Sequence, residues 1–92
     1  MKILTVCGMG LGSGLLLRMQ VEKALKQLGV QADVEVSDMG SARALAKTAD
    51  LVVTSPELAQ QLGDVKPPVL TIVNFVSFNE MLTKLGAVLG KA

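Results

Sequence analysis

Histidine, tryptophan and tyrosine are absent from this 92-residue sequence, and phenylalanine occurs only twice. Because there is no histidine, the chain cannot contain a Cys–His catalytic pair, a phosphohistidine or a histidine-based zinc site, and we expect no metal site and no cofactor. Because Phe75 and Phe78 are the only aromatic residues, side chains that stack on single-stranded bases are also lacking. The hydrophobic core must therefore be aliphatic.

An excess of charge of either sign is lacking too. Nine basic residues stand against eight acidic ones, which gives a net charge of +1. Duplex binding normally needs a basic surface, so this balance argues against nucleic acid as the main partner. No apolar run approaches the roughly 18 to 20 residues that cross a bilayer, so we expect no membrane insertion by this chain.

Cysteine occurs once, at position 7. A single cysteine cannot form an internal disulfide, and a lone thiol is best kept in a reducing compartment. Met1 and Lys2 lead directly into a strand pattern, which leaves no room for a signal peptide. These observations predict a cytoplasmic protein.

Half of the residues are hydrophobic, which is enough to build one small domain over residues 1–92. Short apolar or alternating segments predict strands at 2–6, 31–36, 51–54 and 69–73. Helical spacing of apolar residues and local cap signals predict helices at 13–28, 42–48, 56–62 and 78–89. This alternation predicts an α/β fold: a three-layer sandwich around a four-stranded parallel sheet, with strand order 2-1-3-4 and right-handed crossovers.

Local signals predict several boundaries. Segment 31–36 alternates apolar and polar residues, as an edge strand does when one of its faces is solvated. Ser41 is the predicted N-cap of the helix at 42–48. Ser77 and Glu80 have the spacing of a capping box before the last helix. Ser55 and Asn74 follow the third and fourth strands, where turn chemistry is their expected role.

The stretch from Ile3 to Gly14 carries the functional prediction. An apolar strand leads to Cys7, a glycine-alternating loop follows, and a long helix begins at about Ser13. The glycines allow a tight turn in which several backbone N–H groups point into one concavity, and a helix N-terminus adds donors and partial positive charge. Such a site suits a phosphoryl group and favours the thiolate form of a cysteine.

We therefore predict that Cys7 is a nucleophile at the mouth of a phosphatase-like, phosphate-cradling loop. The predicted phosphate-binding residues are Gly8, Met9, Gly10, Leu11, Gly12, Ser13 and Gly14. The alternatives are a buried structural thiol, a glycine run that serves only a tight turn, and a passive anion- or nucleotide-binding module.

Other loop motifs fit less well. A dinucleotide fingerprint that starts at Gly8 or Gly10 lacks its third glycine, and no Gly-Lys-Ser/Thr follows for a Walker loop. Cysteine phosphatases and arsenate reductases place an arginine where this chain has Ser13, and Arg18 lies more than a helical turn further on. Without a guanidinium, the charge that develops during phosphate-ester hydrolysis is poorly stabilised. A low-molecular-weight cysteine phosphatase or arsenate reductase remains the alternative enzyme.

The segment from Cys7 to Gly14 resembles the active loop of enzyme IIB of the bacterial sugar phosphotransferase system. The resemblance is greatest to the ascorbate-type branch, with galactitol-type relatives less similar in the loop. It extends over nearly the whole chain, through segments 19–21, 29–36, 49–53 and 72–74. The sequence departs from the branch at Gly14, where a second serine is common.

The resemblance implies a phosphotransferase that acts as a relay. A phosphohistidine of a IIA protein would donate its phosphoryl group to Cys7, and the phosphocysteine would pass that group to a sugar, ascorbate-like in this branch, bound by a membrane IIC component. The lack of histidine and of a loop arginine is consistent with this role, because the donor histidine belongs to the partner and a carrier must not hydrolyse its phosphoryl group. A carrier that docks two partners in turn is expected to be a monomer.

Overall fold

The computed structural model describes residues 1–7 and 13–90, apart from the side chains of residues 13 and 14. Within these ranges the strands form a single four-stranded parallel sheet in the order β2-β1-β3-β4. The strands are β1 (Lys2–Val6), β2 (Asp33–Ser37), β3 (Leu51–Thr54) and β4 (Val69–Thr71). The predicted sheet and its strand order are confirmed.

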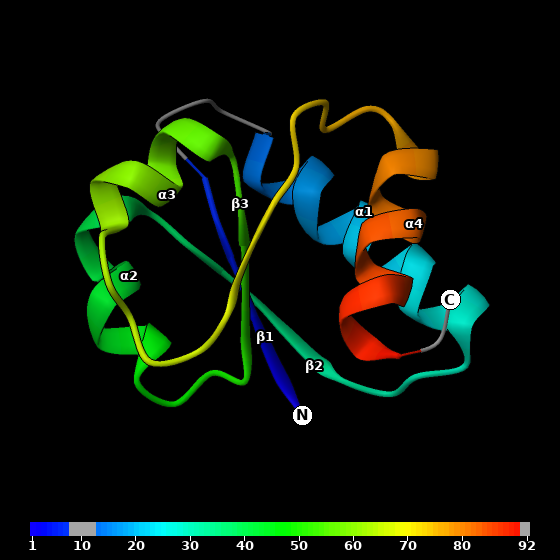
Figure 1. Cartoon of the computed structure of the whole chain (residues 1–92), viewed down its shortest axis with the longest axis horizontal. Helices are drawn as coiled ribbons and strands as arrows, with labels where there is room; N and C mark the ends of the chain where they lie inside the picture. The colour runs from blue at the N-terminus through cyan, green and yellow to red at the C-terminus, as the bar shows by residue number, and fades with distance from the viewer. Residues whose placement is uncertain (8–12, 91–92) are drawn as a thin grey trace.

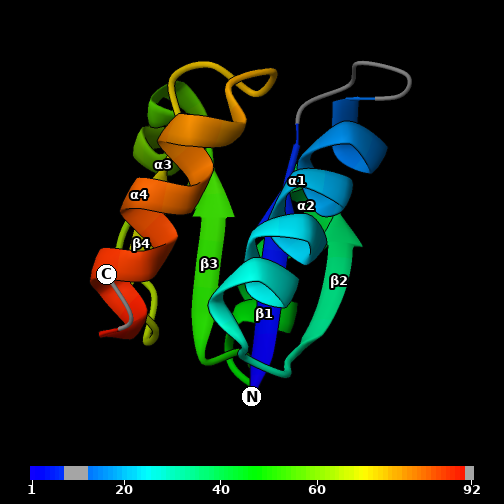
Figure 2. The ribbon, with the colours of Figure 1, turned by 90° about the vertical axis from the view of Figure 1, so that its right-hand side faces the viewer.

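Helices cover both faces of this sheet and complete the predicted three layers. They are α1 (Ser13–Leu28), α2 (Met39–Ala46), α3 (Pro56–Leu62) and α4 (Phe78–Leu89). Helices α1 and α4 lie together on one face and α2 and α3 on the other (Figure 1). Viewed from the α1 and α4 side, β2 and β3 point toward the same edge (Figure 2), and the parallel pairings give β1 and β4 the same direction. We call this edge, where the strands end, the carboxyl edge.

Strand β1 is central, and its alternating side chains divide the core into two parts. Ile3 and Cys7 belong to the apolar cluster beneath α1 and α4, whereas Leu4 and Val6 belong to the cluster beneath α2 and α3. Each of these side chains is at most 3% exposed. Burying an aliphatic side chain contributes about 1.5–3 kcal/mol, so β1 is anchored from both faces.

Helix α2 begins three residues earlier than predicted. Asp38, not Ser41, is its N-cap: an Asp38 carboxylate oxygen accepts from the Ser41 backbone N–H at 2.9 Å. Both residue types are good caps, but a carboxylate also interacts favourably with the positive end of the helix dipole. By contrast, the predicted bounds of α1, α3 and α4 are confirmed, and Ser55 caps α3 through the Leu58 N–H.

Of the two edge strands, β2 is displaced from its predicted range and β4 is shorter than predicted. Strand β2 starts at Asp33, where its N–H first finds a partner in the Met1 carbonyl at 2.8 Å, and it extends to Ser37. Val34 packs against the core, but Val36 is 42% exposed. The alternation placed both valines on the covered face of the strand, and for Val36 this prediction is wrong. Strand β4 ends at Thr71 instead of residue 73, because the Val73 N–H is directed to a side chain described below.

Candidate functional site

Cys7 lies immediately after β1, at the carboxyl edge, as predicted. Its backbone N–H donates to the Ser37 carbonyl at 3.1 Å, which continues the pairing with β2 by one residue. Its side chain is only 3% exposed and packs in the apolar cluster that also contains Leu17 and Ile72. This burial is what a structural thiol would show, and any reaction at the sulfur requires a partner group to reach it.

The predicted phosphate-binding loop falls largely outside the described residues. Gly8, Met9, Gly10, Leu11 and Gly12 are not described, and for Ser13 and Gly14 only their place in the helix is. That place is informative: α1 begins at Ser13, and its first turn contains no acidic residue. The first backbone N–H groups of a helix lack intrahelical acceptors and attract anions. Cys7 and this helix start therefore flank the predicted loop from both sides.

Two threonine hydroxyls hold the end of β1 between its neighbours. Thr54 Oγ1 donates to the Val6 carbonyl at 2.8 Å, and this bond is fully buried. Thr5 Oγ1 donates to the Glu35 carbonyl at the same distance. The residue before Cys7 is thus bonded to β3 through a side chain in addition to the sheet ladder. Sequence reasoning missed Thr54, for which the only signal was a polar residue at the end of an apolar strand.

The loop after β4, residues 73–77, stands at the same edge and is called here the 73–77 loop. The Asn74 side-chain oxygen accepts from the Val76 N–H at 3.1 Å, so the predicted turn role of Asn74 is confirmed. Phe75 packs against the cluster that contains Cys7. Gln20, from α1, donates through Nε2 to the Phe75 carbonyl at 3.0 Å. This bond joins the 73–77 loop to the helix that follows the predicted phosphate loop (Figure 1).

Glu80 holds the first two residues of the 73–77 loop. Its carboxylate oxygens accept from the Val73 N–H at 2.7 Å and from the Asn74 N–H at 2.9 Å. Lys84 Nζ donates to the same carboxylate at 2.7 Å and to the Thr71 carbonyl at 2.9 Å. The hydrogen bond from Lys84, followed by those from the two amides, lowers the pKa of Glu80 from its ordinary value to about 2.

The capping-box prediction for α4 is therefore half right. The Ser77 hydroxyl accepts from the Glu80 N–H at 3.2 Å, as an N-cap should. The return bond, in which the Ser77 N–H would donate to the Glu80 carboxylate, is not made, since that N–H donates to the Asn74 carbonyl at 3.0 Å. The carboxylate is used instead for the amides at the end of β4. The spacing pattern correctly indicates a glutamate acceptor near the start of the helix, but it does not indicate which backbone N–H groups donate to that glutamate.

The carboxyl edge also exposes apolar side chains. On the first two turns of α1, Leu15 and Met19 are each 59% exposed, and in the 73–77 loop Val73 is 75% and Val76 is 69% exposed. Arg18, between the first two, pairs with Glu22 one turn further along α1, at 3.4 Å. Its guanidinium is thus directed away from the helix start, as expected for a residue that does not replace the missing loop arginine.

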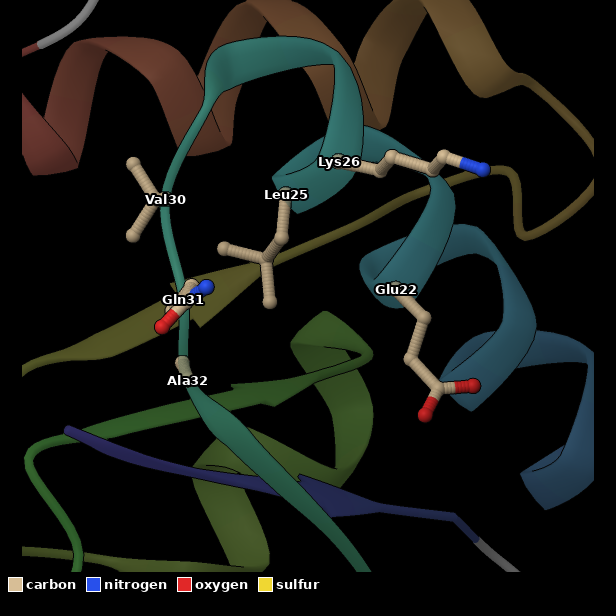
Figure 3. Close-up of a pocket in the computed structure, with 6 residues that line it drawn as sticks. All are labelled: Glu22, Leu25, Lys26, Val30, Gln31 and Ala32. Carbon is tan, nitrogen blue, oxygen red and sulfur yellow. The ribbon is translucent and has the colours of Figure 1, made fainter.

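A separate hollow lies far from Cys7, at the opposite end of α1. It is a groove of about 300 Å3 lined by Glu22, Leu25, Lys26, Val30, Gln31 and Ala32. The side chain of Leu25 reaches from α1 toward the segment that enters β2, while the charged ends of Glu22 and Lys26 extend away from it (Figure 3). This segment leads into the amino end of β2, whereas Ser37, beside Cys7, closes the strand. The groove takes no part in the candidate site.

Two further properties bear on function. Across residues 1–7 and 13–90, no group of three or more Cys, Asp or Glu side chains is placed to bind a metal ion. Within the same part of the chain, every helix is too short or too polar to cross a membrane.

Comparison with known proteins gives a consistent result. Residues 2–87 match the sequence profile of the family described as "PTS system, Lactose/Cellobiose specific IIB subunit". An ascorbate-specific PTS system EIIB component of Mycoplasma pneumoniae is 31% identical over 90 residues, which cover 97% of this chain and 95% of that protein. The corresponding component of Shigella sonnei is 31% identical over 61 residues, or 66% of this chain and 60% of that protein.

A solved structure matches the fold. It is the lactose-specific IIB component domain of the phosphoenolpyruvate:carbohydrate phosphotransferase system (PTS) from Streptococcus pneumoniae. The TM-score is 0.62 with 17% identity, and the match covers 99% of this chain and 96% of that one. At this identity the likeness supports the arrangement of the sheet and helices, while the sequence matches support the family.

Proposed function

Because the chain belongs to the lactose/cellobiose-specific IIB family of the sugar phosphotransferase system, we propose that it is a cysteine phosphocarrier whose acceptor is Cys7. The observation that carries this proposal is the position of Cys7. It directly follows the central strand and, with the N-terminus of α1, flanks a glycine-alternating loop. In an open α/β sheet, ligands bind outside the carboxyl ends of the strands.

The proposed reaction has two displacements at phosphorus. The Cys7 thiolate attacks the phosphoryl group of a phosphohistidine on a IIA protein, so that an S–P bond forms, the N–P bond breaks and neutral imidazole leaves after taking up a proton. A sugar hydroxyl, bound by a membrane IIC component, then attacks the phosphocysteine. The new O–P bond forms, the S–P bond breaks, the hydroxyl proton is released and the thiolate is regenerated.

Backbone amides supply the electrostatic part of this mechanism. We propose that the N–H groups of residues 8–14 bind the phosphoryl oxygens, with the N-terminus of α1 adding partial positive charge. Glycine at position 14 leaves no hydroxyl there to assist. Since Arg18 is paired with Glu22, no guanidinium is supplied from that position to promote hydrolysis. These backbone N–H groups would stabilise the phosphocysteine until the sugar acceptor attacks it.

The relatives' names indicate the sugar class. Both EIIB components described above are ascorbate-specific, and one of them matches almost the whole chain, whereas the lactose-specific domain shares only 17% identity. We therefore propose an ascorbate-like sugar as the final acceptor. We further propose that the chain works in the cytoplasm as a monomeric single domain.

A second function is favoured by one observation, the 3% exposure of Cys7. If the thiol is structural, the protein is a passive anion-binding module whose loop binds phosphate without covalent chemistry. The two functions differ in one respect: only the carrier gains a phosphoryl group on sulfur.

Intact-mass analysis after incubation with a phosphorylated IIA protein tests the proposal. We expect a mass gain of one phosphoryl group in the wild type and no gain in Cys7→Ser. The matched control is Ser55→Ala, which removes a polar side chain from the same edge but leaves the thiol in place. If a competent phospho-IIA donor produces no gain in the wild type, the carrier function is wrong and the passive module is the better account.

A further inference from the structure

The 73–77 loop is held by side chains that belong to two different helices. At its start, the two oxygens of Glu80 accept from two consecutive backbone amides, Val73 and Asn74. At its middle residue, Gln20 of α1 donates to the Phe75 carbonyl at 3.0 Å. We call these three hydrogen bonds the loop brace. Loop segments with few such bonds open readily, so three hydrogen bonds from two helices hold this loop in one conformation.

The Glu80 carboxylate is itself well fixed. Lys84 donates to it at 2.7 Å and also reaches the Thr71 carbonyl, so the side chain is tied to the last residue of β4. The Glu80 side chain is 17% exposed. Charge-assisted hydrogen bonds of this kind are about twice as strong as neutral ones. The brace is therefore preformed before any partner arrives.

The braced loop lies next to the Cys7 site. Phe75 packs against the core cluster that includes Cys7 and Ile72, and the loop runs alongside the start of α1 at the carboxyl edge (Figures 1 and 2). The loop exposes the side chains of Val73, whose N–H is part of the brace, and of Val76, which follows Phe75, at 75% and 69%. Exposed apolar side chains on a rigid backbone are suited to protein contact, because little conformational entropy is lost on docking.

We propose that Glu80 is a positioning residue for phosphoryl transfer: it holds the 73–77 loop in the conformation that contacts the phosphoryl donor protein. This inference rests on the proposed function. The donor is the chosen partner because its phosphohistidine must approach a sulfur that is only 3% exposed. A histidine side chain is short, so the donor backbone must come close to the loops that flank Cys7. Glu80 acts through the loop and does not touch the reacting atoms.

The test compares the KM and kcat of Cys7 phosphorylation in Glu80→Gln and in Glu35→Gln. The Glu80 variant offers one acceptor oxygen to two amides and no charge to Lys84, so the loop loosens. We expect KM for the phosphorylated IIA donor to rise about tenfold, with kcat changed less than about twofold. Glu35→Gln is the matched control, because it is the same substitution and also breaks an ion pair, the one with Lys2, but lies outside the 73–77 loop. It should leave KM unchanged.

A second readout reports on the loop itself. In the wild type the amides of Val73 and Asn74 should exchange slowly with solvent, and in Glu80→Gln they should exchange at least about tenfold faster. If Glu80→Gln does not fold, Gln20→Met, which removes only the bond to Phe75, tests the other anchor with the same expected rise in KM.

The outcomes separate the inference from the function on which it rests. Absence of wild-type phosphorylation would overturn the proposed function. Wild-type phosphorylation with an unchanged KM in Glu80→Gln would overturn only the inference. So would a fall in kcat at constant KM, an equal effect of Glu35→Gln, or a defect confined to transfer from phosphocysteine to sugar.

Discussion

The two edges of the sheet are built in different ways. At the amino edge, Lys2 alone joins three segments: its Nζ lies 2.6 Å from Glu35 Oε1 and 3.2 Å from Thr48 Oγ1, and its backbone N–H donates to Asp50 at 2.8 Å. At the carboxyl edge, the polar side chains of Thr54, Gln20 and Glu80 bond to backbone groups. Two of the three contacts at the amino edge join side chains to one another, whereas most of those at the carboxyl edge join a side chain to backbone, the Lys84–Glu80 pair being the exception.

This difference indicates how the two edges are used. Exposed ion pairs add little stability, about 0–1 kcal/mol each, and tolerate change. Side chains that donate to or accept from the backbone, in the core or in a turn, hold the backbone in one path. At the carboxyl edge, the backbone held in this way surrounds Cys7. Exposed apolar residues also gather at the carboxyl edge, with Val73 and Val76 in its loop. Side chains that position the backbone are therefore concentrated at the carboxyl ends of the strands, around Cys7, whereas the exposed ion pair at their amino ends contributes little.

The largest expected effect tests the carboxyl edge directly. Replacing Cys7 with Ser should abolish phosphoryl transfer from a IIA donor, because the serine hydroxyl is a far weaker nucleophile than a thiolate. The change places a hydroxyl in the apolar cluster where the thiol is buried, so the free energy of unfolding in urea should fall by about 1–3 kcal/mol. Phosphoryl transfer is measured by intact mass and the fold by circular dichroism. Retained transfer in the folded variant would place the acceptor elsewhere in the chain.

The next prediction concerns the buried threonine at this edge. Thr54→Val keeps the shape of the side chain but leaves the buried Val6 carbonyl without its hydroxyl donor. We expect a loss of about 1–3 kcal/mol in the free energy of unfolding, measured in urea. Thr48→Val, at the amino edge, is the control and should cost less than about 0.5 kcal/mol. Equal losses at both positions would contradict the division between the edges.

A pH dependence follows from Glu80. Its pKa is lowered from 4.5 to about 2 in the folded protein, so the unfolded chain takes up its proton first. The stabilisation is fully present above about pH 4.5 and is lost as the pH falls toward 2. With allowance for partial solvent screening, we expect Glu80→Gln to cost about 1–2 kcal/mol at about pH 6. This difference from wild type should shrink steadily below pH 4.5 in urea titrations, and a constant difference would be the contrary result.

The smallest expected effect belongs to the amino edge. Glu35→Gln removes the partner of the Lys2 ammonium, and both side chains are substantially exposed, at 41% and 30%. The loss in unfolding free energy should be about 0.5 kcal/mol and should diminish at high salt. Phosphoryl transfer should be unchanged. A clear fall in transfer would show that the amino edge also contributes to function.

Much of the fold was predictable because local and global signals agree. The apolar run 2–6 requires two covered faces, and the helix after it ends at Gly29, whose φ of 73° is readily adopted only by glycine. The apolar sequences of β1 and β3 fit the interior of the sheet, and the polar alternation of β2 fits an edge. The position of Cys7 at the carboxyl edge was predicted on the same basis and is confirmed. The binding role of residues 8–14 stays a prediction.

What could not be predicted depends on contacts between distant segments. Asp38 and Ser41 both fit a cap, and only the course of the chain decides between them. Glu80 has the spacing for a capping box, but its oxygens bind amides six and seven residues earlier. The hydroxyl of Thr54 finds a carbonyl 48 residues away. In each case the sequence indicates a donor or acceptor, and its partner is set by tertiary structure.

The alternation along β1 has a consequence for how this chain can vary in length. Ile3 and Cys7 share one face of the sheet because their positions differ by four, an even number, while Leu4 and Val6 occupy the other. Deleting or inserting a single residue between positions 3 and 7 would move the cysteine to the face beneath α2 and α3, away from the N-terminus of α1. The number of residues between the start of β1 and Cys7 is therefore fixed by the requirement that the cysteine face α1.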